Sequence, residues 1–212
     1  MQAIDSSISL ANFPPGVVAT NVGHFTHARV VVFLGSHPVS REYAADCAYI
    51  QKLVREIAIP FRTRILAEDH WKKPKNEIRA SHIPDLAKLH YLIDGWDDPE
   101  VRKQLEEAEQ KWRTLVKTSM PHGDEEKELY LLDCEEKHIR WLDEFTLDTF
   151  DTRQESLIYR LFHTLQEVQG RETVILLCGP EHVYSKHPRL QPSCQKLLRV
   201  LEQVPFVILS RY

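Results

Sequence analysis

The stretch Thr173–Val183, with the sequence TVILLCGPEHV, decides the fold that this chain is expected to adopt. It contains five apolar residues in an unbroken run, Val174–Cys178, which stops at Gly179. A short apolar run that ends at a turn residue is typical of a strand buried on both faces, as in a parallel sheet. Glu181 and His182 follow at the carboxyl end of that strand, where open α/β sheets bind their ligands.

A second segment near the N-terminus has the same form. Ala28–His37 (ARVVVFLGSH) is an apolar run followed by Gly35 and then by His37. Apolar residues then recur at helical spacing over residues 43–57, and residues 61–67 (FRTRILA) are a second strand in this prediction. That strand delivers Glu68, Asp69 and His70 just past its end. The order strand, helix, strand predicts a βαβ unit with two parallel strands.

The middle of the chain, about residues 71–145, is predicted to be a helical insertion. It is rich in Lys, Glu, Asp and Trp and contains no convincing strand. Asp98 followed by Pro99 is a good helix start, and a further helix is expected from Asp124 to about Phe145. The charge runs are most simply the solvated faces of these helices.

The C-terminal third is expected to return to the sheet. Thr146–Asp151 is predicted as a junction, which places Arg153 in the first turn of a new helix over residues 152–169. A helix over residues 188–203 and a closing strand over 205–209 follow the key strand. The sequence therefore predicts an irregular segment over residues 1–27 and a single α/β domain over 28–212. That domain has a mostly parallel central sheet flanked by helices, with the helical insertion in its middle.

Length and composition fit a protein of this kind. The chain has 212 residues, 42% of them hydrophobic and 27% charged, which are ordinary globular values. A net charge of −4 argues against nucleic acid as a partner, and no apolar run approaches the roughly 20 residues of a membrane span. The first residues have no basic start and no long apolar centre, so no signal peptide is evident and a cytoplasmic location is expected. The four cysteines show no CxxC spacing and are expected to be buried free thiols.

Polar residues that could carry chemistry meet at one edge if both ends of the chain contribute parallel strands to one sheet. Histidine and carboxylate are ligands of divalent metals, and an open coordination position lets the metal activate water. An arginine nearby could bind an anionic intermediate or a substrate carboxylate. The candidates are His37, Glu68 and His182 as metal ligands, Glu68, Arg153 and His182 as catalytic groups, and Gly35, His70, Gly179 and Glu181 around the substrate.

Each of these residues also has an ordinary structural interpretation. A histidine after a strand is more often a surface or hydrogen-bonding residue than a ligand, and Glu68, Asp69 and His70 could form a polar turn. His138 and His163, on predicted helices, are expected to be structural. No GxSxG, GxGxxG, P-loop or HExxH motif is present, so these competing chemistries are not indicated.

Taken together, these motifs resemble the superfamily that joins the TraB/PrgY, GumN, Tiki, ChaN and erythromycin-esterase proteins. That superfamily carries a glycine-histidine motif after its first strand, an acidic residue after the second, an arginine on a late helix and a second GxxH motif. Here the matching residues are Gly35-Ser36-His37, Glu68, Arg153 and Gly179-Pro180-Glu181-His182, and they cover only the two ends of the chain. The first motif is one residue shorter than the usual GxxH. The resemblance implies a polar pocket at the strand ends that serves metal-dependent peptide cleavage, ester hydrolysis or haem binding.

Three hypotheses remain open from the sequence. The first is a metal-assisted hydrolase acting on an ester or peptide-like bond of a small-molecule or peptide substrate. The second is a non-catalytic binding protein with the same fold, in which the charged helical insertion serves as the surface for a protein partner. The third is a protein that binds haem or another cofactor. The sequence does not decide whether Glu68 or Asp69 faces the pocket, because a shift of one residue exchanges the two faces of a strand.

Overall fold

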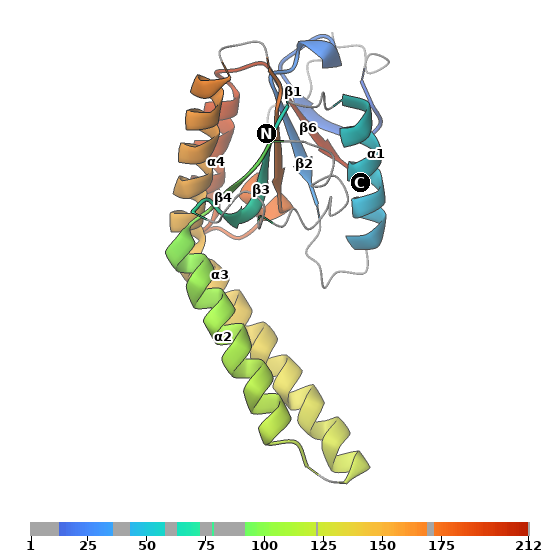
Figure 1. Cartoon of the computed structure of the whole chain (residues 1–212), viewed down its shortest axis with the longest axis vertical. Coiled ribbons are helices and arrows are strands. Elements are labelled where there is room, and N and C mark those ends of the chain that lie inside the picture. The colour runs from blue at the N-terminus through green and yellow to red at the C-terminus, as the bar shows by residue number, and fades with distance from the viewer. Residues whose placement is uncertain are drawn as a thin grey trace.

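The computed structural model describes residues 13–35, 43–57, 63–72, 78, 92–121, 123–168 and 172–211. Over these ranges the chain forms one six-stranded sheet with helices packed against it (Figure 1). This confirms the predicted α/β class with a mostly parallel sheet and helices in the middle of the chain. None of the helices in these ranges combines the length and the apolar character that crossing a bilayer requires.

Five of the six strands run parallel. The strands are β1 (Val17–Thr20), β2 (Val30–Leu34), β3 (Arg64–His70), β4 (Leu92–Asp97), β5 (Val174–Cys178) and β6 (Phe206–Ser210). Their order across the sheet is β1-β6-β2-β5-β3-β4, and only the pairing of β1 with β6 is antiparallel. The carboxyl ends of β2 to β6 therefore lie at one edge of the sheet, which we call the carboxyl edge.

The helices cover both faces of this sheet. They are α1 (Tyr43–Ile57), α2 (Pro99–Thr118), α3 (Asp124–Glu167) and α4 (Gln191–Leu201), with two short 3-10 helices, η2 (Phe25–His27) and η4 (Pro180–His182). The α1 helix packs on one face, while the C-terminal half of α3 and α4 pack on the other (Figure 1). The helical spacing predicted over residues 43–57 is confirmed by α1.

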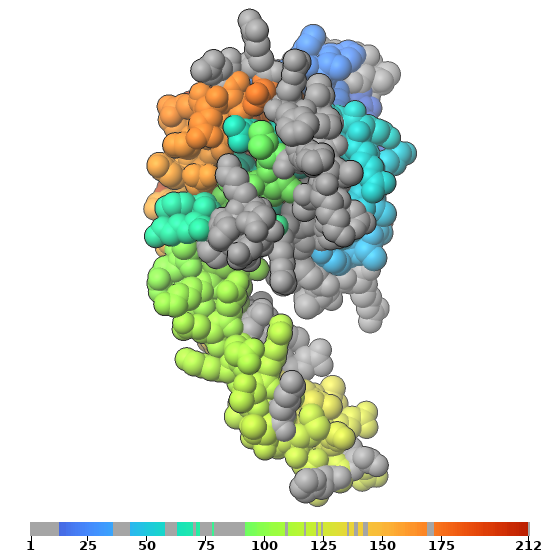
Figure 2. Space-filling view, viewed as in Figure 1, coloured from blue at the N-terminus to red at the C-terminus, as the bar shows by residue number. Residues whose placement is uncertain are grey.

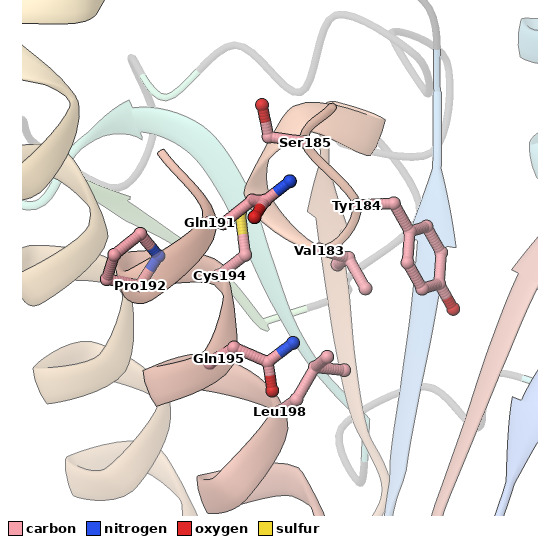
Figure 3. A pocket seen from close by; sticks show the side chains of 8 residues that line it. All are labelled: Val183, Tyr184, Ser185, Gln191, Pro192, Cys194, Gln195 and Leu198. Atoms are coloured by element: carbon pink, nitrogen blue, oxygen red, sulfur yellow. The ribbon is translucent and has the colours of Figure 1, made fainter. Parts of the chain in front are cut away.

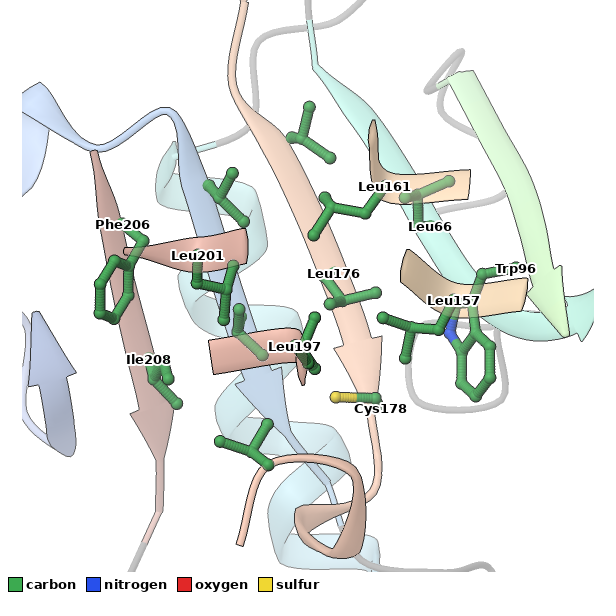
Figure 4. Packing of buried hydrophobic residues seen from close by; sticks show 14 of the residues in the cluster. Leu66, Trp96, Leu157, Leu161, Leu176, Cys178, Leu197, Leu201, Phe206 and Ile208 are labelled. Atoms are coloured by element: carbon green, nitrogen blue, oxygen red, sulfur yellow. The ribbon is translucent and has the colours of Figure 1, made fainter. Parts of the chain in front are cut away.

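The alternation of side chains along the strands divides the core into two layers. In β2, Val31 and Phe33 face α1, whereas Val30 and Val32 face α3 and α4. Figure 4 shows the second layer, in which residues of α3 and α4 lie over the strands. Its labelled members are Leu66, Trp96, Leu157, Leu161, Leu176, Cys178, Leu197, Leu201, Phe206 and Ile208. Both faces are buried, as the continuous apolar runs of β2 and β5 predicted.

The α2 helix and the first half of α3, residues 99–145, form an arm that projects from the body (Figures 1 and 2). Its start is fixed by Asp98, whose carboxylate accepts hydrogen bonds from the backbone N–H groups of Glu100 and Val101, with Pro99 at the first helical position. The predicted helix start at Asp98 is therefore confirmed. Because β4 ends at Asp97, the arm leaves the body from the carboxyl edge.

Four elements differ from the sequence prediction. The second strand, predicted over residues 61–67, is β3 at Arg64–His70, so Glu68, Asp69 and His70 lie within the strand rather than just past its end. Residues 17–20, predicted as irregular, form β1 at the edge of the sheet. Residues 92–97 lie inside the predicted helical insertion but form the edge strand β4, so the bounds 71–145 are too wide. The predicted junction at Thr146–Asp151 is wrong, because α3 runs through it without a break. Arg153 consequently sits inside a long helix rather than in a first turn.

Candidate functional site

The structure brings most of the candidate residues to the carboxyl edge. Gly35 follows β2 there, and its N–H donates to the carbonyl oxygen of Cys178 at the end of β5, at 3.1 Å. Glu68 lies near the end of β3, where the register with β4 shifts, and its side chain reaches α3. Gly179, Glu181 and His182 follow β5, with the last two in η4. His37 lies outside the described residues, as do the side chains of His70 and His138.

Arg153 joins two carboxylates at this edge. Its Nη2 atom donates to Glu68 Oε1 at 2.5 Å and to Asp97 Oδ2 at 3.0 Å. Its Nε atom donates to Asp97 Oδ1, also at 3.0 Å. Asp97 also accepts from the backbone N–H of Asp98, at 2.9 Å. The three side chains form one ion cluster, which settles the orientation of Glu68: it faces α3, on the same side of β3 as Leu66.

Positive side chains determine how the two carboxylates titrate. Burial is the largest single influence on Glu68 and opposes its ionisation, but the charge and the hydrogen bond of Arg153, with the other positive groups nearby, together outweigh it and lower the pKa of Glu68 to about 2. Burial raises the pKa of Asp97, and Arg153 works against that rise. Arg102 adds a second guanidinium, with its Nη1 atom 4.0 Å from Asp97 Oδ2, so the two carboxylates face two positive charges. Both carboxylates already accept hydrogen bonds from Arg153, which is therefore better placed to hold Glu68 than to receive an anionic intermediate.

His182 is fully buried between two aromatic rings. Phe150 of α3 stacks on it with ring centroids 5.0 Å apart, and Trp96 of β4 meets it edge-on at the same distance. The indole N–H of Trp96 donates in turn to the carbonyl oxygen of Leu177, at 2.9 Å, which fixes that ring against β5. Burial lowers the pKa of His182 to about 3, with a further contribution from Arg153. The imidazole is therefore neutral over the physiological range.

The tautomer of His182 follows from its neighbour on α3. The side-chain amide of Gln154 donates from Nε2 to the carbonyl oxygens of His182 and Ser193, at 2.9 and 3.2 Å. Its Oε1 atom is thus left as an acceptor and lies 2.7 Å from His182 Nδ1. A neutral imidazole carries one proton, so Nδ1 holds it and Nε2 keeps a free lone pair. Among the described residues, that buried Nε2 has no hydrogen-bond partner.

The residue before this histidine points at the same atom. Glu181 Oε1 lies 4.0 Å from His182 Nε2, and the carboxylate folds back over Gly179. A Cβ at Gly179 would come within 2.1 Å of Oε1, so glycine leaves the space that this carboxylate occupies. Burial and the negative charge of Glu68 raise the pKa of Glu181. A carboxylate whose pKa is raised by a neighbouring carboxylate indicates a place where a positive charge would be stabilised.

A pocket of about 450 Å³ adjoins the loop that carries His182 (Figure 3). It lies between the segment after η4 and the first turns of α4, and only uncharged side chains line it. They are Val183, Tyr184, Ser185, Gln191, Pro192, Cys194, Gln195 and Leu198. The thiol of Cys194 donates to the carbonyl oxygen of Glu181 at 3.1 Å, which ties the pocket wall to η4. The pocket suits a neutral, hydrogen-bonding group rather than a charged one.

The thiols do not supply a nucleophile here. Cys178 is buried at the end of β5, and burial raises its pKa well above the usual range. A protonated, inaccessible thiol is a poor nucleophile. All four cysteines are free, as the sequence predicted, but Cys47 is only partly buried.

A complete metal centre is not formed by the described part of the chain. Within it, no three His, Cys, Asp or Glu side chains come close enough together to hold one ion. It does contain part of a set of metal-binding atoms. The lone pair of His182 Nε2 and the carboxylates of Glu181 and Glu68 lie at the same carboxyl edge of the sheet. The third predicted ligand, His37, belongs to a segment that is not described.

Several residues of the site were not predicted from the sequence. Asp97 was hidden because β4 was not recognised, and Gln154 because a glutamine carries no motif of its own. In the sequence, Trp96 and Phe150 are recognisable only as large apolar residues near Asp97 and Arg153. Their contact with His182 follows only from the fold. Comparison with protein-family models, with curated proteins and with solved structures finds no match for this chain.

Proposed function

We propose that this protein is a metal-assisted hydrolase that acts on an ester or peptide-like bond at the carboxyl edge of the sheet. The observation that carries the proposal is the unpartnered, buried lone pair of His182 Nε2. A buried polar atom without a partner is costly, and an ion bound at Nε2 would remove that cost. This atom lies in the second of the two motifs that resemble the TraB/Tiki and ChaN superfamily.

The environment of His182 favours a ligand over a general base. A pKa of about 3 makes the ring a weak base at neutral pH, but it also keeps the ring deprotonated, as metal coordination needs. The hydrogen bond from Nδ1–H to Gln154 is the type of outer contact that orients histidine ligands in metal sites. Gln154 is thus a positioning residue in this proposal.

The ion would be held by His182 and Glu68, with His37 as the third ligand. Glu68 is suited to this role because Arg153 keeps it ionised and binds it through Oε1, which leaves Oε2 for the ion. A divalent metal bound there would lower the pKa of a water molecule and supply a nucleophile at neutral pH. Glu181, with its raised pKa, can exchange a proton beside that position. The neutral pocket of Figure 3 would take the uncharged part of the substrate.

The proposal is tested by metal content and by activity measured together. Wild-type protein should bind about one equivalent of Zn²⁺ or Mn²⁺ and melt at a higher temperature with the metal than after chelation. Glu68→Gln and His182→Asn should both lose the metal and the hydrolysis of p-nitrophenyl esters or of a fluorogenic peptide mixture. Glu155→Gln, the same substitution at an exposed position of α3, is the matched control and should behave as wild type.

Two other results would contradict the proposed metal-assisted hydrolysis. Wild-type protein that binds neither ion, and whose melting is unchanged by chelator, would refute the metal-assisted mechanism. Metal binding without hydrolysis of either substrate class would instead support a binding protein that retains this fold. The second candidate function, a binding protein, has support of its own. The arm exposes leucines that have no role in the proposed hydrolysis.

A further inference from the structure

The part of α3 that lies in the arm is apolar on two sides. On the inner side, Cys134 is buried and the hydroxyl of Tyr130 donates to the carbonyl oxygen of Leu115 in α2, at 3.5 Å. On another side, Leu129 and Leu132 are 69% and 58% exposed. A solvated helix in a two-helix arm needs a single apolar side, the one against its partner helix. The second side is thus not explained by the packing of the arm itself.

This second side continues the surface that α3 uses in the body. Leu132 lies 18 residues before Phe150, which is about five full turns at 3.6 residues per turn, so both point in the same direction along the helix. Glu136 lies at the same interval before Gln154. Phe150 and Gln154 contact His182, whereas Leu132 lies beyond the end of the sheet. The exposed leucines therefore face the space below the carboxyl edge, on the side of α3 that carries the candidate site.

The same side of the helix is acidic. Three exposed glutamates flank Leu132. Glu125 and Glu128 lie seven and four residues before it, and Glu136 lies four residues after it, where it also pairs with Arg140 at 2.8 Å. Residues 124–145 contain nine acidic and three basic side chains, whereas α2 contains four acidic and five basic ones. A second copy of this chain would bring an identical acidic surface, which charge repulsion disfavours.

We propose that the outer stripe of the arm, formed by Glu125, Glu128, Leu129, Leu132 and Glu136, docks a basic amphipathic helix of a partner polypeptide. Leucines three residues apart on one helix pack against apolar residues at positions i, i+3, i+4 and i+7 of another. Lysine or arginine on both flanks of that partner helix would pair with Glu125 and Glu128 and would compete with Arg140 for Glu136. This inference is independent of the catalytic proposal, since it rests on the arm alone.

The experiment uses the full-length protein and two labelled synthetic peptides of about 18 residues. The first peptide gathers its leucines on one helical face between lysines, and the second has the same composition with the leucines distributed around the helix. Fluorescence anisotropy should give a dissociation constant for the patterned peptide at least about tenfold lower than for the scrambled one. Raising the salt concentration should weaken the binding of both.

Variants locate the contact on the outer stripe. Leu129→Ser with Leu132→Ser should weaken binding of the patterned peptide at least about tenfold without changing the net charge. Leu131→Ser is the matched control, because Leu131 is 40% exposed but points about 100° away from Leu132. Circular dichroism of each variant establishes that the helices are retained.

Three results would overturn the proposal. Equal binding of the two peptides would show that charge alone attracts them, and an equal loss in Leu131→Ser would place the contact elsewhere. Light scattering that shows a wild-type dimer, dissociated by the double serine variant, would make a second copy of this chain the occupant.

Discussion

Acidification should destabilise this protein through one buried side chain, His182. Its pKa is lowered by burial from 6.5 to about 3 in the folded state. Between these values the unfolded chain binds a proton that the folded chain does not, so stability is complete above about pH 6.5 and falls as the pH decreases. Each pH unit below 6.5 costs about 1.4 kcal/mol, and the loss at about pH 5 is therefore about 2 kcal/mol. Any folded pKa below about 4 gives the same loss at that pH.

The assay is urea unfolding at about pH 7.5 and pH 5, for wild type and for His182→Asn. Asparagine keeps an N–H that can donate to Gln154 but cannot titrate. This variant should start from a lower stability, because it leaves a cavity between Phe150 and Trp96, yet lose about 2 kcal/mol less than wild type on acidification. The same substitution at the exposed His187 should leave the wild-type difference unchanged. Equal losses in wild type and His182→Asn would refute the assignment of a buried, neutral imidazole.

Three further substitutions test the packing around the site. Arg153→Met leaves Glu68 without its hydrogen-bonded partner and Asp97 with only the more distant Arg102, and should lower the unfolding free energy by about 3–5 kcal/mol in urea titrations. A loss below about 1 kcal/mol would mean that the ion cluster does not form. Gly16 has φ +93°, and a Cβ there would lie 2.0 Å from a backbone oxygen, so Gly16→Ala should lower the melting temperature and speed amide exchange at β1. Gly23→Ala, where a Cβ would lie in open space, should change neither. Trp96→Phe removes the hydrogen bond to Leu177 and should cost about 1–3 kcal/mol of unfolding free energy, and no loss would contradict that bond.

The sequence predicted the elements whose pattern is local and regular. The runs of β2 and β5, with a glycine after each, and the apolar spacing of α1 were sufficient to place the parallel strands and one covering helix. The strand β4 was missed because its sequence LIDGWD interrupts the apolar run with Asp94 and Gly95. In the fold, Arg160 of α3 lies 4.0 Å from the carboxylate of Asp94, and this contact joins residues far apart in the chain.

The continuity of α3 was missed for a related reason. Residues 146–151 contain threonine and aspartate, which favour helix starts when they are considered alone. In the structure the hydroxyl of Thr149 donates to the carbonyl oxygen of Phe145, one turn earlier, and so is accommodated within the helix. Phe150 is buried against Leu190 and Cys194 of the last third of the chain. Tertiary packing thus overrides the local preference for a break.

The candidate site was predicted in its motifs and missed in its supporting residues. Glu68, Arg153 and the segment 179–182 could be assigned to one edge because parallel strands end together. Asp97 and Gln154 act through partners that are 56 and 28 residues away, so their roles follow only from the strand order and from the register of α3. Sequence patterns identify groups that can react, whereas the groups that orient them are recognised by their contacts.

The register of α3 connects the chemistry of the site to the rest of the molecule. One side of α3 carries four residues at positions i, i+3, i+4 and i+7, namely Phe150, Arg153, Gln154 and Leu157. They supply, in that order, the ring that stacks on His182, the arginine that joins Glu68 and Asp97, the acceptor that sets the tautomer of His182, and a core residue. A rotation of this helix by one residue, about 100°, would remove all four contacts together. The exposed leucines of the arm extend this same side beyond the sheet, on a helix that runs unbroken from the arm to the site (Figure 1). A partner bound on the outer stripe would therefore hold the very helix that determines which nitrogen of His182 carries the proton.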